Sequence, residues 1–136
     1  MGMKTQPLKK TKKQISLPNL LKYTQDDFNE YIRLRDQDKG CISCSGMVEH
    51  AGRYFSQGHH SALRFNEVNV NGQCLRCNTF LHGNLINYRK GLIKRYGEQK
   101  VQLLESSSVR KTKKWERFEL QALREYFKNE ISKLKN

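Results

Sequence analysis

The sequence predicts an α+β fold: a small ββα core held together by zinc, with flanking N- and C-terminal helices. Two Cys-x2-Cys pairs, Cys41–Cys44 and Cys74–Cys77, bracket a polar insert of 29 residues and contain all the cysteines of the chain. Four thiolates in two close pairs suit a tetrahedral zinc site, because each pair supplies two ligands from one tight turn. Apolar residues with helical spacing occur before the first pair and after the second.

Size and charge limit the possible roles. The 136 residues amount to about one domain, and only 36% are apolar, so we expect a small core in which a metal staple is useful. The net charge is +13, with a basic excess in residues 1–40, 41–97 and 98–136 alike. This distribution favours a phosphate polymer as partner, since basic side chains displace condensed counterions. A generally basic protein without that role is the alternative.

No window of the sequence resembles a signal peptide or a transmembrane span. We therefore expect a cytoplasmic protein. Thiols stay reduced in that compartment, so the paired cysteines indicate a metal site rather than disulfides.

The N-terminal part divides into an arm and a helix. Residues 1–22 are expected to form a flexible basic arm, because lysines crowd it and few apolar residues hold it in place. Thr24 and Asp27 have the spacing of a capping box. A helix should follow to about Asp38 and end at Gly40, which leads into the first cysteine pair.

The insert between the cysteine pairs predicts a short β-hairpin with a long polar loop. Arg53–Phe55 and Ala62–Phe65 are the strand-like pieces, and an Asn-rich run supplies turn residues. A helix from about Asn78 to Tyr96 should then complete the domain formed by residues 23–97. Its expected apolar face consists of Leu81, Leu85, Tyr88, Leu92 and Tyr96.

Residues 98–136 are predicted to form a basic linker and a C-terminal amphipathic helix. A short helical turn over 98–105 and a serine linker at 106–108 precede the helix, which spans about Lys114–Leu134. Its apolar stripe consists of Leu120, Leu123, Phe127, Ile131 and Leu134. We expect this stripe to pack on the same core, and a dimer seam is the alternative.

Polar residues near the second cysteine pair could act on phosphodiesters. Asn78 and His82 are four residues apart, so both would face one side of the expected helix and could bind one divalent ion. Asn69 stands five residues before Cys74, where the second strand should meet the cysteine pair. The alternatives are a surface histidine and an ordinary turn asparagine.

The general base is harder to assign. A base belongs near the end of the first strand, and Arg53 occupies that position. An arginine stays protonated and cannot accept a proton from water, although it can bind phosphate. His59 and His60 in the insert are the other candidates.

Several motifs resemble the lambdoid-phage NinG (Rap) family of recombination endonucleases. They are Cys-Ile-Ser-Cys at 41–44, Ala-Gly-x-Tyr/Phe within 51–55, the Asn-rich run into the second cysteine pair at 63–78, and the Phe-Leu-x-Gly-Asn-Leu string within 80–92. The resemblance covers about residues 25–97 well and the C-terminal helix more loosely. It implies an HNH-type (His-Me finger) nuclease of phage or prophage origin that cuts Holliday junctions and D-loops, with structural zinc on Cys41, Cys44, Cys74 and Cys77.

The same resemblance implies roles for single residues. Asn69 takes the middle Asn position, and Asn78 takes the last ligand position. The chain departs from the family pattern at Arg53, where the resemblance implies histidine. Three explanations are open: an inactive variant, substitution by His59 or His60, or phosphate binding by Arg53 in a protein that recognises junctions without cutting them.

We therefore expect an endonuclease that hydrolyses branched DNA with Mg²⁺ or Mn²⁺. The alternative is a non-catalytic, zinc-dependent protein that binds DNA junctions, and an RNA-binding factor would also fit the charge. Symmetric cutting of a junction would favour a homodimer. The expected phosphate contacts are Arg64, Arg76, Arg89, Lys90, Lys94, Arg95, Lys111, Lys113 and Lys114.

Overall fold

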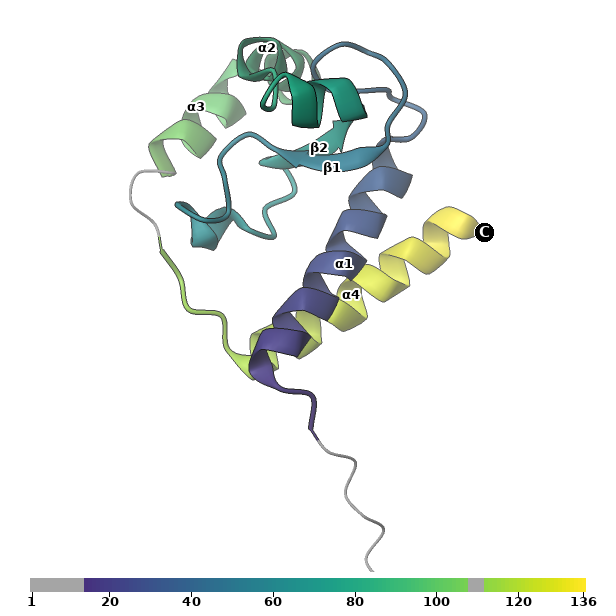
Figure 1. Cartoon of the computed structure of the whole chain (residues 1–136), viewed down its shortest axis with the longest axis vertical. Helices are drawn as coiled ribbons and strands as arrows, with labels where there is room; N and C mark the ends of the chain where they lie inside the picture. The colour runs from purple at the N-terminus through teal and green to yellow at the C-terminus, as the bar shows by residue number, and fades with distance from the viewer. Residues whose placement is uncertain (1–13, 108–111) are drawn as a thin grey trace, which may run out of the picture.

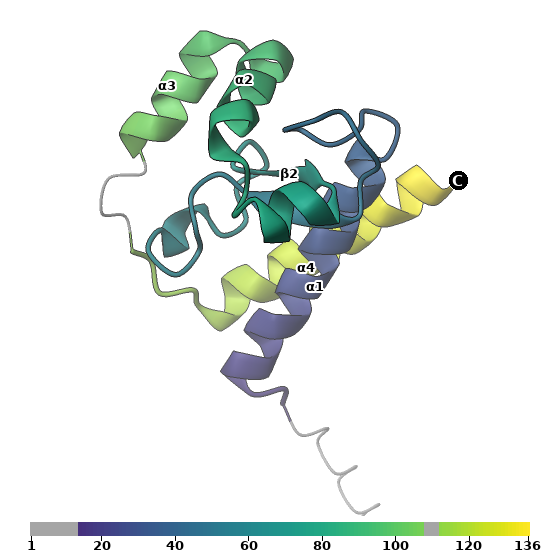
Figure 2. The same ribbon diagram turned by 45° about the horizontal axis from the view of Figure 1, so that its top comes forward.

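The computed structural model describes residues 14–107 and 112–136. It has a mixed α+β fold, mostly helical with one small sheet. The elements in chain order are α1 (Leu17–Asp36), β1 (His50–Arg53), a 3-10 helix (Ser61–Leu63), β2 (Val70–Gln73), a π-helical turn (Arg76–Phe80), α2 (Leu85–Tyr96), α3 (Glu98–Ser107) and α4 (Arg117–Lys135). The sheet lies between the α1–α4 pair and the α2–α3 pair (Figures 1 and 2). None of the described helices is long and apolar enough to cross a membrane.

Helix α1 begins earlier than the capping pattern predicted. Its N-cap is Ser16, whose Oγ accepts a hydrogen bond from the Asn19 amide at 3.3 Å. The predicted capping box at Thr24 is wrong, because Thr24 is buried within the helix and its hydroxyl donates to the Leu20 carbonyl at 2.7 Å. A proline near the helix start suits its first turn, where no intrahelical N–H is needed. Residues from 17 onward therefore belong to α1 rather than to the expected arm, and residues 1–13 lie outside the described part.

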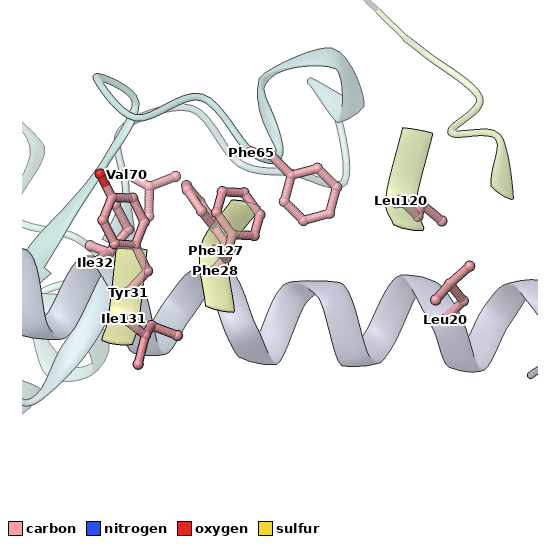
Figure 3. Close-up of a cluster of buried hydrophobic side chains, with 9 residues drawn as sticks. All are labelled: Leu20, Phe28, Tyr31, Ile32, Phe65, Val70, Leu120, Phe127 and Ile131. Carbon is pink, nitrogen blue, oxygen red and sulfur yellow. The ribbon is translucent and has the colours of Figure 1, made fainter. Parts of the chain in front are cut away.

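Helices α1 and α4 pack against each other and form the larger core. Phe28 and Phe127 meet at its centre, with ring centroids 4.9 Å apart. The apolar stripe of α4 thus packs on the same chain, as predicted, and three of its five members are buried. The buried cluster consists of Leu20, Phe28, Tyr31, Ile32, Phe65, Val70, Leu120, Phe127 and Ile131 (Figure 3).

The hairpin forms, but both strands differ from the predicted ones. The first strand was expected over Arg53–Phe55, whereas β1 begins at His50 and ends at Arg53. β1 pairs antiparallel with β2, with His50 opposite Gln73 and Arg53 opposite Val70. The predicted strand Ala62–Phe65 is wrong, since this stretch contains the 3-10 helix. A short apolar run fits either structure. Here Leu63 ends the 3-10 helix and Phe65 lies in the turn after it, and both side chains are buried.

The predicted helix over 78–96 is interrupted. A π-helical turn ends at Phe80, and α2 begins only at Leu85. His82, Gly83 and Asn84 between them all have positive φ, which an α-helix excludes. The ending at Gly97 is confirmed, because it is the C-cap of α2.

The C-terminal elements also differ at their boundaries. α3 extends through Ser107, so part of the expected serine linker is helical, and Ser108 lies outside the described residues. α4 begins at Arg117 rather than Lys114, after a capping box made by Glu116 and Glu119.

A buried ion pair connects α1 to the sheet. Asp36 is fully buried and accepts from Arg35 through both carboxylate oxygens, at 2.7 and 2.8 Å. The Gly72 amide in β2 donates to the same carboxylate at 2.8 Å. Burial opposes the charge of Asp36, but the neighbouring Arg35 guanidinium outweighs it, and the pKa of Asp36 lies below its usual value.

Candidate metal centre and active site

The two cysteine pairs meet at one point. The four Sγ atoms of Cys41, Cys44, Cys74 and Cys77 all lie within 4.8 Å of one another. This is the arrangement that the sequence predicted for a metal site. In the described part of the chain, no other group of three or more histidine, cysteine or carboxylate side chains converges in this way.

The donor set fits a tetrahedral zinc ion. With Zn–S bonds of about 2.3 Å, ligand sulfurs should stand about 3.8 Å apart. Cys44 Sγ and Cys74 Sγ are 3.6 Å apart. N–H groups of Gly46, Cys77 and Asn84 point at three of the sulfurs at 3.4 Å and would stabilise thiolate charge. The four cysteines could therefore hold a metal such as zinc.

Metal binding at this centre must displace protons. Burial raises the pKa of the Cys77 thiol to about 12 in the metal-free chain. The thiolate, not the thiol, is the metal ligand, so zinc uptake releases the proton that Cys77 holds at neutral pH.

A histidine that the sequence analysis did not select lies next to Asn78. His50 begins β1, and its Nδ1 is 3.1 Å from Asn78 Nδ2 in the π-helical turn. Both side chains are half-buried. The pair stands where the first strand meets the residue after the second cysteine pair. The sheet register brings His50 there, because it pairs with Gln73, the residue before Cys74.

Asn69 is a fully buried scaffold residue. Its Oδ1 accepts from the Phe55 amide at 2.9 Å, and its Nδ2 donates to the Phe55 carbonyl at 3.0 Å. The side chain thereby replaces a strand partner for the segment that follows β1. It holds the backbone of the insert, and none of its hydrogen bonds goes to a histidine of the described chain.

Arg53 does not share a site with Asn78. Odd and even positions of a strand face opposite sides, so His50 and Arg53 point away from each other. Arg53 turns toward α1, where its Nη2 donates to Asn29 Oδ1 at 3.2 Å. Burial and the nearby Arg64 lower the pKa of Arg53 to about 10, so it stays protonated at neutral pH and cannot be the base.

The remaining predicted histidines are separate from this pair. His59 is exposed in the loop, and the His60 ring packs against Phe55 with centroids 5.1 Å apart. His82 is exposed and has a φ of 49° in the turn before α2. The helical spacing that was to bring Asn78 and His82 to one ion does not exist, because the helix is interrupted between them.

The predicted phosphate contacts fall into two groups. Some are engaged within the protein: Arg64 donates to Gln25 at 2.7 Å, Arg89 to Glu105 at 2.8 Å, Arg95 to the Gly40 carbonyl at 2.6 Å, and Lys113 to Glu119 at 2.8 Å. The others are exposed and have no ion pair with residues 14–107 or 112–136: Arg76, Lys90, Lys94 and Lys114. Lys111 lies outside the described residues.

Comparison with known proteins decides the family. A family model described as Bacteriophage Lambda NinG protein matches residues 3–136. The chain belongs to the NinG family. It is 36% identical over 119 residues to Protein ninG of Escherichia phage lambda, 35% identical to that of Escherichia phage 933W, and 34% identical to that of Salmonella phage P22. No solved structure matches the chain.

The NinG match extends over nearly the whole chain, beyond residues 25–97 that carried the motif resemblance. The alignments cover 85% of this chain but only 57% of the lambda protein and 58% of the other two. The chain thus spans a little under three fifths of the length of these NinG relatives.

Proposed function

We propose that this NinG-family chain is a metal-dependent endonuclease that hydrolyses phosphodiesters in branched DNA, such as Holliday junctions and D-loops. It would act in the cytoplasm of a bacterium that carries the phage or prophage. The observation that supports the proposal most is the contact between His50 and Asn78 beside the cysteine centre. The net charge of +13 supports a nucleic-acid substrate.

In this proposal His50 replaces Arg53, His59 and His60 as the general base. With Asn78 donating to Nδ1, the proton of a neutral His50 ring is on Nε2. If the Asn78 amide turns over, its oxygen accepts from Nδ1–H, and Nε2 is left free to take a proton from water. Asn78 would then orient the base in the tautomer that the reaction needs.

A catalytic Mg²⁺ or Mn²⁺ ion would stabilise the developing charge on the scissile phosphate. The interrupted helix does not bring Asn78 and His82 to one ion, so this proposal does not keep them as a shared ligand pair. Since Mg²⁺ commonly keeps several waters and takes only one or two protein ligands beside substrate phosphates, a sparse donor set suits it. The HNH (His-Me finger) assignment belongs to the same proposal and is supported by the order of strand, strand, cysteine pair and helix.

The test is cleavage of a four-way junction and of linear duplex by the zinc-loaded chain, with and without Mg²⁺ or Mn²⁺. We expect metal-dependent cutting that prefers the junction, and a loss of about 10²- to 10⁴-fold in His50→Gln, as for removal of a general base. His59→Gln is the matched control, because His59 is exposed in the loop, and it should cut at the wild-type rate. Wild-type cutting by His50→Gln would refute the assignment of the base. Cuts at symmetric positions on opposite strands would support a homodimer.

Arg53 favours a second candidate, a non-catalytic protein that binds DNA junctions with zinc as its structural metal. The position at which the resemblance implies a histidine carries an arginine that is positively charged at neutral pH. Junction binding without cutting under every divalent ion would support this candidate. Cutting that appears only in Arg53→His would instead mark an inactivated nuclease. Tighter binding to structured RNA than to junction DNA at equal salt would contradict both candidates.

A further inference from the structure

Two arginines are held side by side on the α1 face of the sheet by neutral amides. Arg53 donates to Asn29 Oδ1 at 3.2 Å, and Arg64 donates through Nε to Gln25 Oε1 at 2.7 Å. The Gln25 amide in turn donates to Asn29 Oδ1 at 2.9 Å. Because Gln25 and Asn29 are one helical turn apart on α1, this chain of amides fixes the two guanidinium groups next to each other.

Neither guanidinium has an acidic partner. No ion pair in residues 14–107 or 112–136 involves Arg53 or Arg64. Residues 1–13 and 108–111 contain no Asp or Glu that could supply one. Arg53 Nε is buried without any hydrogen-bond partner in the described structure. Such a charge is costly to bury unless an opposite charge compensates it.

Arg35 shows how this protein compensates a buried arginine. Its side chain is 15% exposed and binds Asp36 through two nitrogens. Further donors reach the carbonyls of Glu67 and Val70. Arg53 lies against the same helix, yet only one of its five N–H donors has a partner among the described residues.

We propose that Arg53 and Arg64 form a binding site for one phosphate group, which they contact through their terminal Nη atoms. Arg53 Nε is closed to solvent and Arg64 Nε is taken by Gln25, so the terminal nitrogens are the donors left for a ligand. Two guanidinium forks match the oxygens of a phosphate better than lysines would. If the proposed function holds, this phosphate belongs to the DNA backbone.

The surroundings of Arg64 suit a nucleic-acid backbone. A hollow next to it is lined by the polar side chains of Ser61, Lys113 and Lys114 and by the apolar side chains of Leu17, Pro18, Leu21, Trp115 and Leu120. Lys113 Nζ stands 4.9 Å from the centre of the Trp115 ring, and Lys114 is exposed. A chain of phosphates leaving the arginine pair would meet the exposed Lys114, whereas the charge of Lys113 is already paired with Glu119. The site lies on the face of the sheet opposite to His50, so it would bind a phosphate distant from the scissile one.

The first experiment measures affinity for a four-way junction across a series of KCl concentrations, without Mg²⁺ or Mn²⁺ so that no cutting occurs. The double variant Arg53→Gln/Arg64→Gln should lower the slope of log K against log [KCl] by about 0.9, the value for one lost phosphate contact. Each single variant should lose on the order of tenfold or more in affinity. Their effects should be less than additive, because both arginines hold the same phosphate. Lys128→Gln removes one exposed charge from α4 and should leave the slope unchanged.

The second experiment measures thermal unfolding of the zinc-loaded chain in chloride and in inorganic phosphate at equal ionic strength. In chloride, Arg53→Gln should unfold at the wild-type temperature or above it, because a half-buried charge without an acidic partner is removed, whereas Arg35→Gln should unfold lower. Phosphate should stabilise the wild type and fail to stabilise the double variant, by mass action.

Arg53→Gln could unfold at a lower temperature than the wild type in both chloride and phosphate, with the slope of log K against log [KCl] unchanged. That result would show that Arg53 is structural and would overturn the proposal. Stabilisation by phosphate with an unchanged junction slope would overturn the assignment to DNA. A lowered slope in a protein that never cuts would support the site while rejecting the nuclease.

Discussion

Substitution of Gly91 by alanine tests the contact between α2 and the first cysteine pair. A Cβ at position 91 would lie 2.0 Å from the Ile42 carbonyl oxygen, whereas ordinary contacts begin at 3.4 Å. The backbones must therefore separate by about 1.4 Å. Ile42 cannot simply retreat, because its amide donates to the Gly72 carbonyl in β2 at 2.9 Å. The displacement would act directly on Cys41, a predicted zinc ligand.

Two effects of this substitution oppose each other. Alanine in a helix is better than glycine by about 1 kcal/mol. Overpacking of a well-packed contact costs about 1–3 kcal/mol, and more when only backbone can move. We expect the steric effect to win, with a net loss of about 2 kcal/mol in the free energy of unfolding and a melting temperature lower by roughly 8 °C. Zinc affinity should also fall, because the first pair no longer meets the second.

The assays are thermal unfolding at saturating zinc and competition for zinc with a chromophoric chelator. Gly58→Ala is the matched control, because a Cβ there would meet no atom within 4 Å and the glycine has no positive φ. That variant should be neutral or more stable by up to about 1 kcal/mol. A Gly91→Ala protein as stable as Gly58→Ala would refute the close packing of α2 on the cysteine pair.

Three further predictions follow from the described contacts. Asp36→Asn should cost about 3–5 kcal/mol by leaving Arg35 buried without its partner, measured by denaturant unfolding at neutral pH. The pKa of Asp36 in the folded protein is depressed, so its contribution to the free energy of unfolding is present above pH 3.8 and is lost as the pH falls through that folded pKa. The difference in unfolding free energy between Asp36→Asn and the wild type should therefore narrow only in that acid range. Removal of zinc should unfold the core, and zinc affinity should rise with pH throughout the neutral range, because Cys77, with a pKa of about 12, must lose its proton to bind; a pH-independent affinity in chelator competition would contradict thiolate ligation. Asn69→Ala should lose roughly 2–3 kcal/mol in thermal unfolding by stranding the amide and carbonyl of Phe55, and an unaltered melting temperature would show that water replaces both bonds.

The features that the sequence predicted well depend on spacing that local chemistry fixes. A Cys-x2-Cys turn brings two sulfurs together whatever surrounds it, so two such turns predict one metal centre. The stripe on α4 was also recoverable, because an amphipathic helix must bury its apolar face somewhere. Phe127 and Ile131 do so against α1 of the same chain.

β2 could not be found from strand propensity. Its residues Val-Asn-Gly-Gln include only one with a strong preference for strands. Buried side-chain amides hold it instead: Asn71 Nδ2 donates to the Val68 carbonyl at 2.8 Å, and Gln73 Nε2 donates to the Gly83 carbonyl at 2.8 Å. A buried asparagine or glutamine looks like a turn residue until its partners from distant segments are known.

The interruption before α2 had a local signal that periodicity masked. Leu81 and Leu85 extend the apolar face of α2 in sequence, yet they are 42% and 44% exposed. Gly83 and Asn84 between them are the residue types that tolerate positive φ most readily. The Gly83–Asn84 dipeptide therefore predicts a break in the helix at this point, although the four-residue spacing of Leu81 and Leu85 predicts that the helix continues.

The two faces of β1 point toward different helices, and this separates the proposed base, His50, from Arg53. Ala51 packs on the α1–α4 core and Arg53 bonds to α1, whereas His50 reaches the turn after the second cysteine pair. One four-residue strand thus presents a histidine to one face and an arginine to the other. The position that the resemblance implies for the base and the histidine next to Asn78 therefore lie on opposite faces of β1, because successive side chains of a strand alternate. The neutral amides around Arg53 and the Asn78 amide beside His50 are what separate the two positions chemically.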